Sequence, residues 1–409
     1  MAGVHPGRAW AVFGVREFRT LWLASLTSIM GDQLARVALS ILVFQRTGSA
    51  ALTAGTYALT MIPALVSGAL LSWLADLFPR RRVLVACDLI RAALVAVMAL
   101  PGVPLPVLAA LVVAVQLAEA PFSAAHGAVL PDVLGPRYEA GQAVQLITYQ
   151  ACLVAGFAVG GLVVANVGAN AALAIDASTF AASAVLIWFG LGAHPVAAVV
   201  RPARRWWAEV RAGAAPVLAD RRLRTLLWLG WLALFTVVPE GLAVPFAQLT
   251  GAGGAGVGAV LAAEPAGAVA GAMLLRLVSR RHRLRALGVL AVGTSLPLLG
   301  YWAQPGLAAA LVLLFVSGLC SAYQVTAGAT FVQLAPAAVR GRALGFARAG
   351  MIAGQGTGIV AGGVLAQSLG PTAAIAWAGT AGVLTALAVA GAWTRCVPDT
   401  IAAALPAES

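Results

Sequence analysis

The sequence is dominated by long apolar stretches that follow one another almost without interruption. Hydrophobic residues make up 61% of the 409 positions and charged residues only 10%, which leaves too little polar surface for a soluble domain. A membrane-spanning helix needs ~20 apolar residues, so the chain has room for about twelve. We expect spans at roughly 18–44, 52–76, 83–101, 104–126, 141–165, 170–192, 224–247, 254–278, 285–303, 306–329, 343–368 and 372–394. The start, MAGVHPGRAW, lacks the apolar core of a cleaved signal peptide, so we expect the first helix to direct insertion.

The 26 basic residues are all arginine, and they collect in alternate connections between the expected spans. This asymmetry is the positive-inside pattern, which predicts that both termini and the central loop are cytoplasmic. The net charge of +12 then reflects topology and contact with anionic lipid headgroups. We expect no nucleic-acid partner, because the arginines do not form one compact patch. The composition, rich in alanine and glycine, is typical of a GC-rich bacterial genome and favours a multi-pass protein of the bacterial cytoplasmic membrane.

Short segments of the first half return in the second. FRTLWL begins at Phe18 and LRTLLW at Leu223, an offset of 205 residues that also carries Pro131 onto Pro336. Duplicated halves with a substrate site between them are typical of transporters. We therefore expect an all-α integral membrane protein whose twelve transmembrane helices form two six-helix pseudo-repeats around a central cavity. The expected parts are an N-terminal bundle, a basic amphipathic cytoplasmic linker, a C-terminal bundle and a cytoplasmic tail, at 1–192, 193–223, 224–395 and 396–409.

The connection after the second expected span, SWLADLFPRRRVL, resembles a loop motif of the major facilitator superfamily. In that family an aspartate stands here between two glycines, and basic residues follow. This chain keeps Asp76 and the arginines at 80–82, but it has Ser72 and Pro79 in place of the glycines. The stretch VRGRALGF, before the eleventh span, is similar to the second-half copy of this loop.

Further motifs resemble the proton-coupled exporters of the same superfamily. GFAVGG is similar to their antiporter motif and provides Gly156, Gly160 and Gly161, with Phe157 where the family has proline. GDQLAR, CDLIRA and IDASTF, in the first, third and sixth spans, resemble the branch of macrolide-efflux proteins and siderophore exporters such as those of enterobactin. This resemblance implies multidrug or antibiotic efflux, with export of a small amphipathic compound such as a drug, an antibiotic or a siderophore.

The loop resemblance also implies a gate on the cytoplasmic side. We expect Asp76 to approach the start of the eleventh helix, whose N-terminus stabilises a carboxylate by about 0.3–1 kcal/mol. The substitution Asp76→Asn should then favour the inward-open state. The expected gate residues are Asp76, Arg80, Arg81, Arg82, Arg340 and Arg342.

Six of the fourteen acidic residues lie within the apolar stretches. An ionised carboxylate in a bilayer costs a few kcal/mol, so each must pair with a cation, face water or take up a proton. Asp32, Glu119 and Glu240 fall on spans one, four and seven, which line the cavity in the resembled superfamily, and we expect them to carry the coupled proton. Arg36, one turn after Asp32, would tune its proton affinity. The alternative is a permanent Asp32–Arg36 pair that only holds the first helix in place.

Structural roles are favoured for the other three buried acids. Asp88 and Arg91 stand three residues apart, a spacing that favours an ion pair on one helix face. The sixth span lies outside the cavity in the resembled superfamily, so we expect a packing hydrogen bond for Asp176. Glu264 precedes Pro265 and is expected to cap the disturbed helix there.

Several amide and phenol side chains on the expected cavity helices can orient a substrate without demanding one particular charge. Hydrogen bonds between membrane helices use the same residue types, so both roles remain open. The substrate-cavity candidates are Gln33, Gln116, Gln145, Tyr149, Tyr323, Gln324 and Gln355.

The pattern of reactive residues argues against an enzyme. The four histidines are scattered, and the four cysteines lack metal-ligand spacing and are expected to be packing residues. A standard ATP-binding phosphate loop needs a lysine, which this chain lacks. We therefore expect no catalytic residue, no metal and no cofactor, with the proton gradient as energy source.

These observations together predict a monomeric secondary active transporter for a small-molecule substrate. Two alternatives stay open: proton-coupled uptake of a small metabolite, and a non-transporting ligand receptor on the same fold. No residue in the sequence decides the direction of transport.

Overall fold

The structure is a computed structural model that describes residues 11–63, 77–192, 206–337 and 339–404. Contacts divide the chain into two compact units. Unit 1 comprises Met1–Arg46 and Leu59–Arg201, and unit 2 comprises Thr47–Ala58 and Pro202–Ser409. The expected gate residue Asp76 and residues 193–205 of the expected linker lie outside the described residues.

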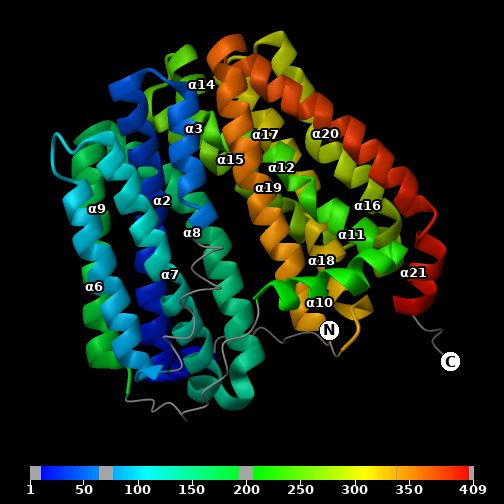
Figure 1. Ribbon diagram of the computed structural model, residues 1–409, viewed down its shortest axis with the longest axis horizontal. Helices are drawn as coiled ribbons and strands as arrows, with labels where there is room; N and C mark the ends of the chain where they lie inside the picture. The colour runs from blue at the N-terminus through cyan, green and yellow to red at the C-terminus, as the bar shows by residue number, and fades with distance from the viewer. Residues whose placement is uncertain (1–10, 64–76, 193–205, 338, 405–409) are drawn as a thin grey trace. The chain divides into compact units, whose positions relative to one another are not determined.

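Among its described residues, unit 1 has five long helices, α2, α6, α7, α8 and α9. Of these, α6 packs against both α7 and α9 (Figure 1). Its elements are η1 (Ala11–Gly14), α2 (Arg16–Thr47), α6 (Arg80–Met98), α7 (Leu105–Leu134), η2 (Gly135–Arg137), α8 (Tyr138–Val167) and α9 (Ala169–Gly190).

Unit 2 contains longer helices and a region of short helical pieces between α11 and α15. In it α15 packs against α17, and α16 packs against α20 (Figure 1). Its elements are α3 (Ala50–Leu59, of which the last residue belongs to unit 1), α10 (Trp206–Ala219), α11 (Arg221–Trp231), α12 (Ala233–Thr236), α13 (Val238–Gly241), α14 (Ala243–Leu249), α15 (Gly253–Leu275), α16 (Arg280–Ser295), η3 (Leu296–Ala303), α17 (Leu307–Ser321), α18 (Tyr323–Leu334), α19 (Arg340–Leu369), α20 (Pro371–Thr394) and α21 (Val397–Ala404).

Within the described ranges, nine helical stretches are long and apolar enough to cross a membrane. One of them, Leu105–Val167, is 63 residues long and contains two of the expected spans. The expected span at 52–76 lies partly outside the described residues. The same ranges contain helices and no strand, so the predicted all-α, multi-span membrane fold is confirmed.

The helix α3 belongs to unit 2, although the sequence led us to expect it in the N-terminal bundle. Small residues explain this placement: a Cβ at Gly363 of α19 would lie 2.4 Å from the Cβ of Ala54. Near the start of α3, the hydroxyl of Ser49 donates a hydrogen bond to Gln367 Oε1 at 3.1 Å. Close backbone approach and this polar contact together hold α3 against α19.

Glycines end corresponding helices in the two units. The helix α8 meets α9 at Gly168 (φ +83°), and α19 meets α20 at Gly370 (φ +86°). Both values lie in the left-handed region, which only glycine adopts without a steric cost.

The helix α11 begins with a side-chain cap, because the side chain of Asp220 accepts a hydrogen bond from the backbone N–H of Arg222. Burial raises the pKa of Asp220, but the bonds from Arg222 outweigh burial and hold that pKa below its usual value.

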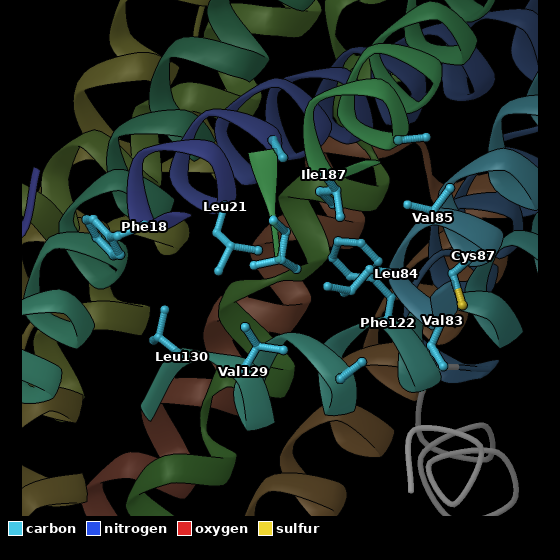
Figure 2. Close-up of a cluster of buried hydrophobic side chains, with 14 of the residues drawn as sticks. Phe18, Leu21, Val83, Leu84, Val85, Cys87, Phe122, Val129, Leu130 and Ile187 are labelled. Carbon is cyan, nitrogen blue, oxygen red and sulfur yellow. The ribbon is translucent and has the colours of Figure 1, made fainter. Parts of the chain in front are cut away.

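Each unit has its own apolar core. In unit 1 the core joins Phe18 and Leu21 of α2 to Leu84 of α6, Phe122 of α7 and Ile187 of α9 (Figure 2). These side chains are less than one-tenth exposed. The core fixes the turns of α2, α6, α7 and α9 relative to one another, and the same helices carry the buried charges of unit 1.

Helices α15 and α17 approach each other through three glycines. A Cβ at Gly267 would lie 2.0 Å from the carbonyl oxygen of Phe315, and one at Gly271 would lie 2.1 Å from that of Leu319. A Cβ at Gly318 would lie 2.0 Å from the carbonyl oxygen of Glu264. Backbone atoms cannot give way as a flexible side chain can, so the two helices would have to separate.

We expect Gly318→Ala to destabilise unit 2 by about 1–3 kcal/mol, the usual cost of overpacking. The matched control is Gly328→Ala on α18, where nothing lies within 4 Å of the new Cβ and helix propensity favours alanine by about 0.5–1 kcal/mol. Thermal unfolding of both purified variants in detergent measures the difference. Equal unfolding temperatures would show that the contact of α15 with α17 tolerates a Cβ.

Candidate functional site

Three of the motifs singled out in the sequence meet inside unit 1. GDQLAR lies on α2, CDLIRA on α6 and IDASTF on α9, and α7 adds one further acid. We call the ionisable residues that they bring together the charge cluster, which consists of Asp32, Arg36, Asp88, Arg91, Glu119 and Asp176.

Arg91 is the centre of the charge cluster and is only 2% exposed. Its Nη2 donates to Asp88 Oδ1 at 2.6 Å, and its Nη1 donates to Glu119 Oε2 at 2.5 Å. The guanidinium also lies over the rings of Phe122 and Phe180, 4.3 and 4.6 Å from their centroids. Aromatic faces attract a desolvated cation, so both rings and both carboxylates stabilise the buried charge.

Asp88 is fully buried and accepts a second hydrogen bond, from the hydroxyl of Ser183 at 2.6 Å. The ion pair that the three-residue spacing predicts is therefore present. The spacing did not predict its extension to Glu119, whose side chain remains 40% exposed. Glu119 thus connects a fully buried ion pair to a more accessible part of unit 1.

Asp32 and Asp176 face one small cavity of about 30 Å³. Arg36, Thr60 and Gln116 add further polar groups to its wall, and apolar side chains of α2, α6 and α7 line the rest. This volume accommodates about two water molecules. The cavity places Asp176 beside Asp32, whereas the sequence led us to expect only a packing role for Asp176.

A second pair of acids lies in unit 2. The hydroxyl of Tyr57 on α3 donates to Glu240 Oε2 on α13 at 2.7 Å. Glu264 on α15 is close enough for electrostatic repulsion by Glu240. The helix α15 runs without a break through Pro265, so the expected helix disturbance at Glu264 is absent.

Two of the expected substrate-cavity residues lie in contacts between helices. Gln33 is 2% exposed, and its stem would be 2.9 Å from a Cβ at Gly156. Tyr323 is fully buried and donates its hydroxyl to the carbonyl oxygen of Leu229 at 2.5 Å. These placements favour packing and not substrate contact for both side chains. Gln116 lines the cavity of the charge cluster, Tyr149 is exposed, and Gln324 and Gln355 are partly buried.

The histidine on α7 has partners that sequence spacing did not reveal. His126 Nε2 lies 3.3 Å from Ser25 Oγ and 3.4 Å from Gln145 Nε2, and its ring stacks on Phe122. His126 stands seven residues, or two helical turns, after Glu119. This spacing in the sequence predicts that the two side chains lie on one helix face.

The antiporter-like glycines pack α8 against α2. A Cβ at Gly160 would lie 3.2 Å from the Cα of Leu34, and Gly161 is buried beside it. Gly156 and Gly160, one helical turn apart, form a smooth helix face that allows close backbone approach to α2. This contact positions α2, and with it Asp32.

Four of the arginines expected at the gate lie against residues of their own unit. Arg80 donates to Asp132 at 2.5 Å, and Arg81 donates to the carbonyl oxygen of Leu191 at 3.2 Å. Arg340 opens α19 and donates to the carbonyl oxygen of Ala335, while the backbone of Arg342 abuts Gly213 of α10. Arg82 lies in the first turn of α6 beside Arg80 and Arg81.

A helical bundle that crosses the membrane many times, with ionisable side chains buried between its helices, is typical of membrane transport proteins. The family model of the Major Facilitator Superfamily matches residues 21–245. That match covers more than half of the chain, and the protein belongs to the major facilitator superfamily. No curated protein matches the sequence.

Solved structures of transporters share the fold. The chain is similar to a peptide transporter POT at 14% identity, with 94% of this chain and 95% of that chain covered and a TM-score of 0.76. It is similar to the nucleoside transporter NupG at 15% identity, with 95% and 99% covered and a TM-score of 0.69. The structure of a proton dependent oligopeptide transporter matches at 14% identity, with 93% and 99% covered and a TM-score of 0.65. Family and fold are those of a small-molecule transporter and not of an enzyme.

Proposed function

We propose that the protein is a proton-coupled secondary transporter that exports a small amphipathic compound by alternating access. The observation that carries this proposal is the charge imbalance of the charge cluster, in which four carboxyls accompany only the two guanidiniums of Arg36 and Arg91. An excess of negative charge between membrane-spanning helices is costly, even where one carboxyl, that of Glu119, is partly exposed. The cluster reaches neutrality when it takes up two protons.

Proton uptake explains the imbalance without any further component. A carboxyl that is neutral in one state of the transporter and ionised in another carries protons across the membrane as access alternates. The partly exposed Glu119 provides the contact with water that such exchange needs, while Arg91 fixes its position. One of the similar structures is that of a proton dependent oligopeptide transporter, so this fold is compatible with proton dependence.

Export is favoured by the motifs that meet in the charge cluster. GDQLAR, CDLIRA and IDASTF resemble the drug and siderophore exporters, and each contributes at least one ionisable residue to the same site. The substrate class implied by that resemblance is a small amphipathic compound. In this proposal the transporter works as a monomer in the bacterial cytoplasmic membrane, with both termini in the cytoplasm.

Glu240 is our candidate for a coupling or substrate-binding acid in unit 2. It accepts a hydrogen bond from Tyr57, so its charge state affects how firmly α3 is held. A cation is a stronger partner for a carboxylate than a neutral tyrosine is. A cationic group of a substrate would therefore displace Tyr57 from Glu240, and the loss of this hydrogen bond would loosen α3.

The test is a panel of compound-efflux assays in an exporter-deficient bacterial host, with and without a proton uncoupler. We expect the protein to lower the cellular content of at least one amphipathic compound, and the uncoupler to abolish this effect. The empty vector is the control. Accumulation in place of extrusion would establish uptake, and binding without counterflow in vesicles would establish a receptor. Efflux that persists with the uncoupler would contradict proton coupling.

A further inference from the structure

Asp176 is buried more completely than its hydrogen bonding explains. Its side chain is 1% exposed, yet among the residues that the structure describes its carboxyl has one hydrogen-bond partner, the hydroxyl of Thr179 at 3.3 Å from Oδ1. An ionised carboxylate can accept about four hydrogen bonds, and a buried one with a single long bond is costly. This carboxyl therefore needs water, a proton or both.

The packing of α9 on α2 directs Asp176 toward Asp32. A Cβ on Gly31 would lie 2.2 Å from Asp176 Oδ1 and 2.2 Å from Thr179 Oγ1, so only glycine allows this approach. Gly31 immediately precedes Asp32, and both acids line the cavity of about 30 Å³. Gly31 of GDQLAR thus packs against Asp176 of IDASTF and places it at the same cavity as Asp32.

Each neighbouring helix contributes charge to this pair of acids. Arg36 lies on the same helix as Asp32, α6 contributes Asp88 and Arg91, and α7 contributes Glu119. The terminal nitrogens of Arg91 already bond to Asp88 and Glu119, and within the described part of the chain no side chain donates a hydrogen bond to Asp32. Two carboxyls that face one small cavity repel each other when both are ionised.

We propose that Asp32 and Asp176 form an acid pair that holds one shared proton across the water-filled cavity, which makes Asp176 a second proton-carrying residue. When the pair loads, one proton from water converts two carboxylates into a carboxyl and a carboxylate. In this proposal, water in the cavity connects the two carboxyls that line it. When the pair unloads, the same proton returns to water. This proposal rests on the proposed proton coupling, but the pair can be detected without any transport.

The experiment is pH-difference infrared spectroscopy of the purified protein in lipid, without substrate. The C=O stretch of a protonated carboxyl reports the shared proton directly. Among the carboxyl bands that titrate in the unchanged protein, we expect one that is lost in Asp32→Asn and equally in Asp176→Asn. The double variant should lose no more of this band's intensity than either single variant does, since the two acids share one proton. Asp132→Asn is the control, because Asp132 pairs with Arg80 at a helix end, where it is 53% exposed.

Separate bands, lost one by one and additively in the two single variants, would overturn the shared proton. An unchanged band in Asp176→Asn would overturn the role of Asp176. If Asp176→Asn does not fold, Gly31→Ala displaces the Asp176 carboxyl without removing it, and a shift of the same band is then expected. A band that behaves as expected in a protein without proton-driven transport would support the pair and refute the proposed function.

Discussion

Replacing Arg91 with leucine is expected to remove most of the folded protein from the membrane. The substitution leaves Asp88, which is fully buried, without its ion-pair partner. Breaking a buried ion pair in this way costs about 3–5 kcal/mol, which is a large part of the stability of a typical domain. Loss of the contacts with Phe122 and Phe180 adds to this cost.

Removing both members of the pair should be less harmful than removing one. In Asp88→Leu/Arg91→Leu the fully buried carboxylate is removed together with its partner, and only Glu119, which is 40% exposed, loses an ion pair. We therefore expect the double variant to regain part of the lost stability. Arg81→Leu is the matched control, because Arg81 also lies over an aromatic ring, that of Trp188, but at a helix end. Protein level and thermal unfolding in detergent measure all three variants. If Arg91→Leu unfolds at the same temperature as the unchanged protein, the ion pair does not hold unit 1 together.

Much of the fold could be predicted from residue patterns alone. The long apolar stretches specify membrane helices, because a bilayer leaves the backbone no other partner for its hydrogen bonds. The spacing of Asp88 and Arg91 places both on one helix face, and their ion pair follows from helix geometry. Gly168 and Gly370 end helices at corresponding places in the two units, in keeping with the internal repeat.

The site itself depends on contacts that no local pattern contains. Tyr57 and Glu240 are 183 residues apart, and their hydrogen bond arises only because α3 packs within unit 2. Asp176 was expected to be a packing residue, since family resemblance places its helix outside the cavity. The close approach at Gly31 instead turns it toward Asp32. Which cavity or neighbour a buried acid faces depends on helix rotation, which sequence spacing along one helix does not determine.

Replacing Asp32 with asparagine is expected to leave a folded protein that no longer concentrates its substrate. Asparagine has nearly the same volume but cannot release a proton. Moving one proton across the membrane provides about 2.3 kcal/mol per 100 mV, which corresponds to a substrate concentration ratio of about 50. Without that proton we expect the ratio to fall to about 1, while passive exchange of substrate down its own gradient continues.

The competing explanation is that Asp32 and Arg36 form a permanent pair that holds α2 in place. It predicts a different result, since removal of one partner would leave a buried charge unpaired and cost about 3–5 kcal/mol, with a clear fall in protein level. In the described part of the chain Asp32 makes no ion pair, although Arg36 lines the same cavity. This geometry favours a proton-exchanging carboxyl over a structural one.

Proteoliposomes that carry a proton gradient separate the two explanations. Substrate accumulation and counterflow are measured for the unchanged protein, for Asp32→Asn and for Asp132→Asn, whose exposed ion pair is worth only about 0–1 kcal/mol. Asp132→Asn should concentrate substrate normally. Asp32→Asn should show counterflow without accumulation, because binding and alternating access remain but the proton no longer moves with them. A well-expressed Asp32→Asn that still concentrates substrate against a gradient would exclude Asp32 as the coupling residue and leave Glu119, Asp176 and Glu240 as candidates.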